Sequence, residues 1–238
     1  MAAFPLQRDI DYPESDGRPL GETDRHREEI VDLVFALDQR YKDASDIYVS
    51  GNLLLYYERY DARKVVSPDV FLVEGVSKEK RPIYKLWEEG RAPSLVIEVT
   101  SKSTWTEDLV EKKGKYTRLG VAEYFLFDPL NEYLRPRLQG FRLTRGRYLP
   151  IQPFGDGSLT SEVTGLRLQM EGDRLRLVDL ASGEKLLRTC EERAAREAAE
   201  ARSALDRAAR EAAEARARAA EAEVARLRRE LAERLRGD

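Results

Sequence analysis

Hydrophobic residues follow a helical spacing near the start of the chain. Residues 23–41 place Ile30, Leu33 and Leu37 on one face. Apolar positions three and four residues apart form a stripe that packs against a core. The spacing therefore predicts an amphipathic helix over this range, preceded by turn-rich residues 1–21 that wrap the surface.

The spacing changes to that of strands in the middle of the chain. The stretch "PSLVIEVTSKST", residues 93–104, is apolar at almost every position from 94 to 100. Such a run is typical of a strand that is covered on both faces. A helix over about 107–119 and a strand over about 123–127 follow. The order strand, helix, strand predicts that the two strands are parallel neighbours.

Three further segments extend the predicted sheet. "DIYVSGNLLLYYE", residues 46–58, predicts two strands around a turn at Ser50–Gly51–Asn52, and "KVVSPDVFLVEG", residues 64–75, predicts another that contains Pro68. Residues 78–93 form a charged loop or a short excursion from the sheet. Residues 140–187 alternate apolar and charged side chains around glycine turns, as an exposed antiparallel sheet does. Together these segments predict an α/β fold with a mixed sheet flanked by helices.

The last part of the chain, residues 189–238, has a different composition. It consists almost entirely of Ala, Arg, Glu and Leu, and "AAREAAEAR" occurs twice, 14 residues apart. Alanines and Leu205 recur at steps of four and three, which is the seam of a coiled coil. A solvated single helix is the alternative, because alanine buries little area. We therefore predict two domains, 1–188 and 189–238, the second a long helix that joins two copies of the chain or recruits a partner.

Composition narrows the classes of function. The chain has 238 residues, a formal net charge of -3, one cysteine and one histidine. A single Cys and a single His leave little room for a zinc enzyme, and the charge argues against a broadly basic nucleic-acid binder. No apolar run reaches the length of a membrane span, so a cytoplasmic protein is expected.

Three charged residues occupy positions where the pattern is apolar. Glu98 lies in the middle of the buried strand, Asp69 precedes "VFLV", and Lys112 lies on the inner stripe of the 107–119 helix. A buried carboxylate needs a proton, a cation or a metal. If Asp69 and Glu98 converge, they offer the hard oxygen ligands that Mg²⁺ prefers, and the Val99 carbonyl could complete the set. A nearby lysine then favours metal-assisted phosphodiester hydrolysis.

Each of these residues also has a structural explanation. Asp69 could organise the turn after Pro68, and Lys112 could pair with Asp108. Glu22 and His26 are two further candidates at the start of the first helix. Glu22 could simply place a negative charge at the start of a helix, where it is favourable, and His26 could simply pack in the core.

These residues carry a resemblance to a known family. "SPDVFLV", "PSLVIEVTSKST" and "DLVEKKGKYTRLGVAEYFLFDP" resemble the Uma-type restriction endonuclease family of the PD-(D/E)XK nuclease superfamily. The resemblance extends from about residue 21 to residue 129 and on to about residue 187. It implies a restriction-endonuclease-like α/β core in which Asp69 and Glu98 hold the metal.

The resemblance also implies roles for other side chains. The superfamily usually has a lysine two residues after the second carboxylate, where this chain has Thr100. In the Uma type the lysine instead comes from the next helix, which implies Lys112, with Lys102 as the competing candidate. Glu22 matches an acid, and His26 a histidine, of the family's first helix.

The leading hypothesis is therefore a Mg²⁺-dependent endonuclease acting on DNA, with Mn²⁺ as an alternative ion. Asp69, Glu98 and the Val99 carbonyl are the predicted metal ligands. The segments "KEKRPIYK" and "RLTRGR" are candidate contacts to phosphate. The alternative hypothesis is a catalytically silent nuclease fold that binds or assembles through its helical tail. A homo-oligomer is expected in either case, and no membrane partner.

Overall fold

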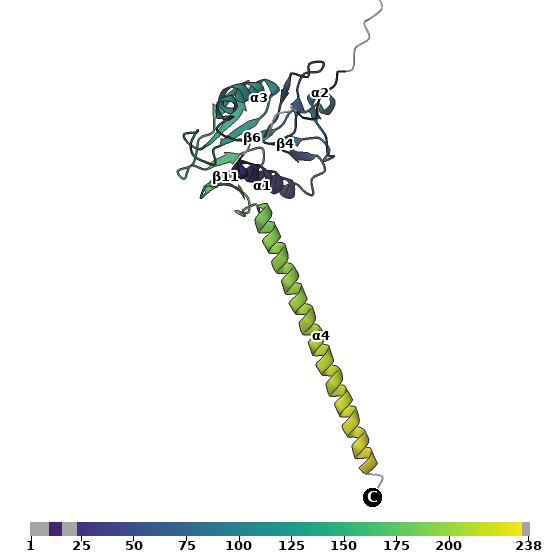
Figure 1. Cartoon of the computed structure of the whole chain (residues 1–238). Helices are drawn as coiled ribbons and strands as arrows, with labels where there is room; N and C mark the ends of the chain where they lie inside the picture. Colours follow the sequence, from purple (N-terminus) through teal and green to yellow (C-terminus); the bar gives the residue numbers. More distant parts are fainter. Residues whose placement is uncertain (1–9, 16–22, 235–238) are drawn as a thin grey trace, which may run out of the picture. The chain divides into compact units, whose positions relative to one another are not determined.

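The computed structural model describes residues 10–15 and 23–234 (Figure 1). The chain divides into two compact units, residues 1–189 and 190–238. The mixed α/β class predicted from the sequence, with a mixed sheet flanked by helices and a long C-terminal helix, is confirmed.

A six-stranded sheet forms the centre of the first unit, in the strand order β1-β4-β6-β7-β8-β9. Its members are β1 (Ile47–Ser50), β4 (Val70–Glu74), β6 (Leu95–Val99), β7 (Glu123–Phe127), β8 (Leu138–Thr144) and β9 (Arg147–Pro150). The two central strands, β6 and β7, are parallel, as predicted, and the other neighbours are antiparallel. Every residue of β6 and β7 is buried, which agrees with the apolar runs in their sequences.

Helices cover both faces of this sheet (Figure 1). On one face lies α1 (Asp24–Arg40), whose N-cap Thr23 accepts a hydrogen bond from the His26 amide. Ile30, Leu33 and Leu37 of α1 share a core cluster with Ile97 and other residues of that face. The other face is covered by η1 (Glu107–Lys112), a π-helical segment, and α3 (Lys113–Leu119), which continues it. The predicted helix therefore has the right extent, but its first half is wound more loosely.

A second, three-stranded antiparallel sheet comprises β10 (Leu159–Ser161), β11 (Leu166–Glu171) and β12 (Arg174–Asp179). The expectation of an exposed sheet is wrong for one of its faces. The leucines of β11 and β12 are buried in the same cluster as α1. Alternation with charged residues indicates that only one face meets water, and this sheet uses its apolar face to extend the core.

Two other predictions need correction. Residues 64–75 form two short strands, β3 (Val65–Val66) and β4, because Pro68 between them has no amide hydrogen to donate to a ladder. Of the two alternatives for residues 78–93, the structure has the short excursion, which contains β5 (Tyr84–Lys85) and α2 (Leu86–Glu89). Strands β2 (Leu55–Tyr56), β3 and β5 form a separate small sheet, so β1 and β2 do not pair with each other.

The second unit is one helix, α4 (Thr189–Arg234), of 46 residues. Its side chains from 192 to 230 are exposed and form intrahelical ion pairs such as Arg193–Glu197 and Glu214–Arg218. Within the residues described, no helix combines the length and the apolar character that crossing a bilayer requires.

Candidate active site

The candidate site lies where β4 begins and β6 ends. Asp69 immediately precedes β4, and the pairing of Val70 with Ile97 sets it beside Glu98 and Val99. The Asp69 carboxylate accepts a hydrogen bond from the Val99 amide at 2.8 Å, and the Asp69 amide lies 3.4 Å from Glu98 Oε2. The two predicted metal carboxylates are therefore neighbours.

A glycine makes room for this turn. A Cβ atom on Gly51 would lie 2.3 Å from the Asp69 carbonyl oxygen, so no side chain fits there. The next amide, that of Asn52, donates to the Pro68 carbonyl at 2.9 Å. The sequence identified these residues as a turn signal, but their contribution here is to hold the Pro68–Asp69 backbone.

Glu98 is fully buried and is held by two side chains from the covering helix. Lys112 Nζ donates to Glu98 Oε2 at 2.8 Å, and the Tyr116 hydroxyl donates to Glu98 Oε1 at 2.6 Å. Lys112 Nζ also lies 2.9 Å from Asp108 Oδ1. The expected Lys112–Asp108 pair therefore exists together with the contact to Glu98, and the two explanations for Lys112 are not exclusive.

The π-helical segment brings Asp108 into this cluster. Asp108 is fully buried within η1, and its carbonyl accepts a hydrogen bond from the Tyr124 hydroxyl of β7 at 2.9 Å. A π-helical segment inside an α-helix is rare and is often found at functional sites. The sequence indicates Asp108 only as the partner of Lys112 four residues on, and its burial beside Glu98 depends on the fold.

Burial and unbalanced charge shift the pKa values of this cluster. Among the described residues, Glu98 and Asp108 form ion pairs with the buried ammonium group of Lys112, and the Asp69 charge also acts on it. Burial raises the pKa of Glu98 well above its ordinary value, and the Asp69 and Asp108 charges add to this rise against the opposing charge of Lys112. Burial alone would lower the pKa of Lys112, but the three carboxylates outweigh it and raise that pKa, so the ammonium stays charged.

His26 approaches from the opposite face of the sheet. Its Nε2 lies 2.5 Å from the Val99 carbonyl oxygen and 3.6 Å from Asp69 Oδ2. Burial opposes ionisation of Asp69, but the contacts with His26 and the charge of Lys112 outweigh it and lower the Asp69 pKa. The candidate site thus combines groups from both faces at the end of β6.

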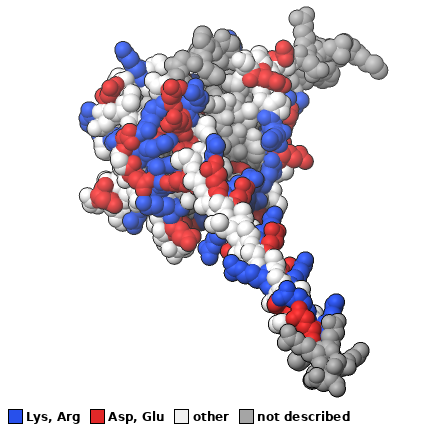
Figure 2. Space-filling view, turned by 60° about the horizontal axis from the view of Figure 1, so that its bottom comes forward, with Lys and Arg blue, Asp and Glu red and all other residues white. Residues whose placement is uncertain are grey.

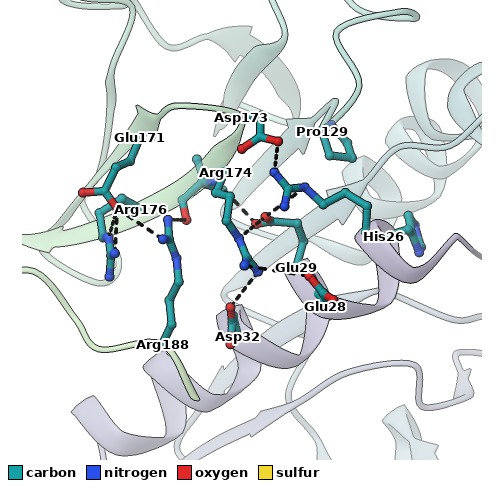
Figure 3. Close-up of polar contacts among 12 residues, drawn as sticks. His26, Glu28, Glu29, Asp32, Pro129, Glu171, Asp173, Arg174, Arg176 and Arg188 are labelled. Carbon is teal, nitrogen blue, oxygen red and sulfur yellow. Dashed lines mark hydrogen bonds and ion pairs between the residues drawn. The ribbon is translucent and has the colours of Figure 1, made fainter. Parts of the chain in front are cut away.

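A second ionic cluster anchors the helix that carries His26 (Figure 3). Arg174 of β12 reaches α1, where its Nε is 2.8 Å from Glu29 Oε1 and its Nη2 is 2.7 Å from Asp32 Oδ2. The Thr189 hydroxyl donates to the other Asp32 oxygen at 2.6 Å. These bonds attach α1 to the second sheet and so fix the position from which His26 reaches Val99.

The other predicted residues are placed differently. Glu22 lies outside the described residues. Lys102 is exposed in the turn after β6, whereas Lys112 contacts Glu98. The roles assigned to all these residues remain predictions.

The donor set at the end of β6 fits Mg²⁺ in its chemistry. Asp69 and Glu98 supply carboxylate oxygens and Val99 a carbonyl oxygen, all hard ligands. A divalent cation would favour the ionised form of the buried Glu98 carboxyl group, whose pKa burial raises. Among the described residues there is no group of three or more His, Cys, Asp or Glu side chains arranged to hold a metal. Backbone oxygen and water would therefore have to supply the remaining ligands.

The two predicted phosphate-binding segments are partly engaged within the protein, and Arg145 and Arg147 of the second are exposed. Arg81 forms an ion pair with Glu89 and lies over the Tyr48 ring, and Arg142 pairs with Glu123 and with a further glutamate. On the face shown in Figure 2, basic and acidic side chains of the described residues are intermixed without a broad field of one sign. Contact of these segments with DNA stays a prediction.

Comparison with known proteins places the chain in a family. The family described as "Uma2: Putative restriction endonuclease" matches residues 2–176. The chain belongs to the Uma2 family. Membership of Uma2 supports a nuclease, that is, a hydrolase acting on nucleic acids, and confirms the resemblance found in the sequence.

One solved structure similar to this Uma2 chain is a "putative nuclease belonging to DUF820" from Anabaena variabilis ATCC 29413. It shares 13% sequence identity, with a TM-score of 0.44, over 63% of this chain and 81% of that one. None of the curated proteins matches this chain.

Proposed function

We propose that this Uma2 protein is a Mg²⁺-dependent endonuclease that hydrolyses phosphodiester bonds of DNA, with Mn²⁺ as an alternative ion. One observation supports this most directly. Asp69, Glu98 and Asp108 lie together in the interior with one ammonium group between them. Such a surplus of buried carboxylate is costly for folding alone, and a hard divalent cation explains it.

Each residue has a distinct role in this proposal. Asp69, Glu98 and the Val99 carbonyl would hold the metal, which when bound polarises a phosphoryl oxygen and lowers the pKa of bound water. Lys112 stays protonated, so it does not act as a base. It fixes the Glu98 carboxylate and presents positive charge to the phosphate as negative charge develops on it.

His26 and Tyr116 act as positioning residues. The His26 contact orients the Val99 carbonyl, and the Tyr116 hydroxyl holds the Glu98 oxygen that Lys112 does not. Glu22 is retained as a candidate for a further acidic ligand, on the family resemblance alone.

A cleavage assay with matched lysine variants tests this function. Purified protein is incubated with duplex DNA, single-stranded DNA and RNA, each with Mg²⁺, Mn²⁺ or EDTA. We expect metal-dependent internal cleavage of DNA that Asp69→Asn and Lys112→Met abolish and that Lys102→Met, which removes an exposed cation outside the buried cluster, only weakens. Absence of cleavage on every substrate, with both ions, would contradict the proposal and favour a silent binding module. Loss of activity in Lys102→Met but not in Lys112→Met would contradict the assignment of the lysine.

We further propose that α4 pairs two copies of the chain in parallel and in register. We take Ala201, Leu205, Ala208 and Ala212 as the seam of the coiled coil. In a parallel pair, the residues on either side of the seam in one helix meet those of the other helix five residues further on. All three charged combinations are then of opposite sign: Glu197 with Arg202, Glu211 with Arg216 and Arg218 with Glu223. This complementarity favours a second copy over an unrelated partner.

Cysteine cross-linking tests the pairing and its direction. In a Cys190→Ser background, Ala201→Cys and Ala215→Cys lie in the seam, whereas Ser203→Cys lies on the outer face. We expect the two seam variants, each alone, to form disulfide-linked dimers on mild oxidation and Ser203→Cys to remain monomeric in denaturing gels. A monomer at tens of micromolar in sedimentation experiments would contradict the pairing.

A further inference from the structure

Two aromatic rings form a partly exposed pair near the candidate site. The rings of Trp105 and Tyr133 are nearly parallel, at an interplanar angle of 14° with their centroids 6.4 Å apart. The Trp105 residue is 36% exposed. A large aromatic side chain that remains in water although a core is available often marks a binding surface.

The chain path places this pair at the same sheet edge as the candidate site. Trp105 follows the end of β6 by six residues, and Tyr133 follows the end of β7 by the same number. Because β6 and β7 are parallel, the loops after them leave one edge of the sheet together. The Thr100 amide donates to the Phe127 carbonyl at 2.7 Å, so the two strands are still joined where these loops begin.

Hydrogen bonds hold both loops in place. In the first, the Ser101 amide donates to Thr104 Oγ1 at 3.1 Å, and the Trp105 amide donates to the Ser101 carbonyl at 3.1 Å. In the second, the fully buried Asp128 accepts the Tyr133 amide at 2.6 Å through Oδ2, which also accepts the next amide. The aromatic pair is therefore built into ordered turns before any ligand binds.

The charges near the pair suit a nucleic-acid strand. Lys102 lies in the same turn as Trp105, and Arg135 lies two residues after Tyr133; both are exposed. One acid, Glu132, is also exposed in the second loop. By contrast, the Arg167 guanidinium lies over the ring of Phe154, which is exposed elsewhere in the molecule.

We propose that Trp105 and Tyr133 form a stacking platform for an unpaired nucleobase of the substrate, with Lys102 and Arg135 beside its backbone. This inference rests on the proposed function. A base presents a flat apolar face to an aromatic ring only when it is unstacked, so the platform fits single-stranded or splayed nucleotides rather than intact duplex. Trp105 contacts the base, and Tyr133 supports the indole from behind.

Binding measured under conditions that prevent cleavage tests the platform separately from catalysis. The probe is a fluorescently labelled, mixed-sequence DNA strand of about 20 nucleotides, titrated in Ca²⁺ and again in EDTA, with a blunt duplex of the same sequence as comparison. We expect Trp105→Ala to weaken binding of the single strand on the order of 10-fold, as loss of one stacked base does. Trp105→Phe keeps a ring and restores most of the affinity. Phe154→Ala, which removes an exposed ring elsewhere, leaves binding unchanged.

Fluorescence gives a direct readout of the contact. The chain has two tryptophans, so in a Trp87→Phe background the emission comes from Trp105 alone. We expect the single strand to quench it and the duplex to leave it nearly unchanged. Unchanged affinity in Trp105→Ala, or equal quenching by duplex, would overturn the platform even if the wild type cleaves DNA. Binding that depends on Trp105 without any cleavage would support the platform and remove the proposed hydrolysis instead.

Discussion

The two buried ionic clusters of this protein differ in their balance of charge. Between α1 and β12, Glu29 and Asp32 meet the forked guanidinium of Arg174, and Arg25 lies 3.9 Å from Glu29 as a second cation. The remaining oxygens accept hydrogen bonds from Leu175 and Thr189. At the end of β6, three carboxylates share the one ammonium of Lys112. The first cluster is satisfied by the protein itself, whereas in the second three acidic groups surround one ammonium group and burial raises the pKa of Glu98.

This difference separates a structural joint from a candidate catalytic site. A buried ion pair with complete hydrogen bonding is costly to break and fixes the relation of two elements. A buried cluster with unmatched charge reduces folding stability and is retained where function needs it. Removal of a carboxylate charge should therefore reduce activity but not stability in the cluster at the end of β6, and stability but not activity in the cluster between α1 and β12.

The largest expected effect is the loss of activity in Glu98→Gln. This change removes a predicted metal ligand, and we expect metal-dependent cleavage to fall on the order of 1,000-fold or more. The melting temperature should stay the same or rise, because the change relieves repulsion among buried carboxylates. The measurements are initial cleavage rates and thermal melting followed by circular dichroism.

Glu29→Gln is the matched control in the balanced cluster. It should lower the free energy of unfolding by about 2 kcal/mol, because a hydrogen bond to the charged Arg174 is weakened. Cleavage per folded molecule should be largely kept. A stability loss in Glu98→Gln as large as that in Glu29→Gln would contradict the distinction between the two clusters.

The next effect is the destabilisation expected in Arg174→Met. Both Glu29 and Asp32 would remain buried without their cation, which should cost about 3–5 kcal/mol of unfolding free energy. For a domain of this size the melting temperature should fall by roughly 10 °C. Arg27→Met, which removes an exposed arginine from the same helix, should change the melting temperature by less than 2 °C. Similar melting of both variants would show that the α1–β12 joint is unimportant.

Metal binding should distinguish the two clusters by a smaller shift in melting temperature. At ten times its dissociation constant, Mg²⁺ should stabilise the wild type by about 1.4 kcal/mol, or roughly 3–5 °C. The shift should disappear in Asp69→Asn and persist in Glu29→Gln, as measured by differential scanning calorimetry with and without EDTA. An equal shift in all three proteins would place the metal elsewhere.

The smallest effect concerns acid stability at the β11–β12 hairpin. Lys185 and Arg176 lower the pKa of Glu171 from 4.5 to about 2, so the folded state holds the ionised form more tightly than the unfolded chain does. Its contribution to stability is complete above about pH 4.5 and is lost as the pH falls toward 2. In Glu171→Gln, the fall in melting temperature between pH 5 and pH 3 should be less steep. An unchanged slope would mean that other carboxylates dominate acid unfolding.

The sequence predicts the unbalanced cluster better than the balanced one. Glu98 and Lys112 stand out because each interrupts an apolar pattern, and the parallel pairing of β6 with β7 follows from two buried strands around a helix. Asp108 does not stand out, because its burial depends on the π-helical winding of η1. Glu29 and Asp32 resemble ordinary charges on an amphipathic helix, and their partner Arg174 lies more than 140 residues away. Such a contact depends on the folded arrangement and leaves no local pattern.

The π-helical segment makes the length of residues 107–112 critical. A π-helical turn holds one residue more than an α-helical turn does, so deletion of one residue would let η1 relax to regular α-helix. Deletion of the exposed Val110 would then leave Asp108 and Lys112 three residues apart instead of four, which changes the geometry of their ion pair. Insertions and deletions that most surface helices of a protein tolerate would here alter how the Asp108 carboxylate meets the Lys112 ammonium, so variation among related sequences should keep the number of residues in this segment constant.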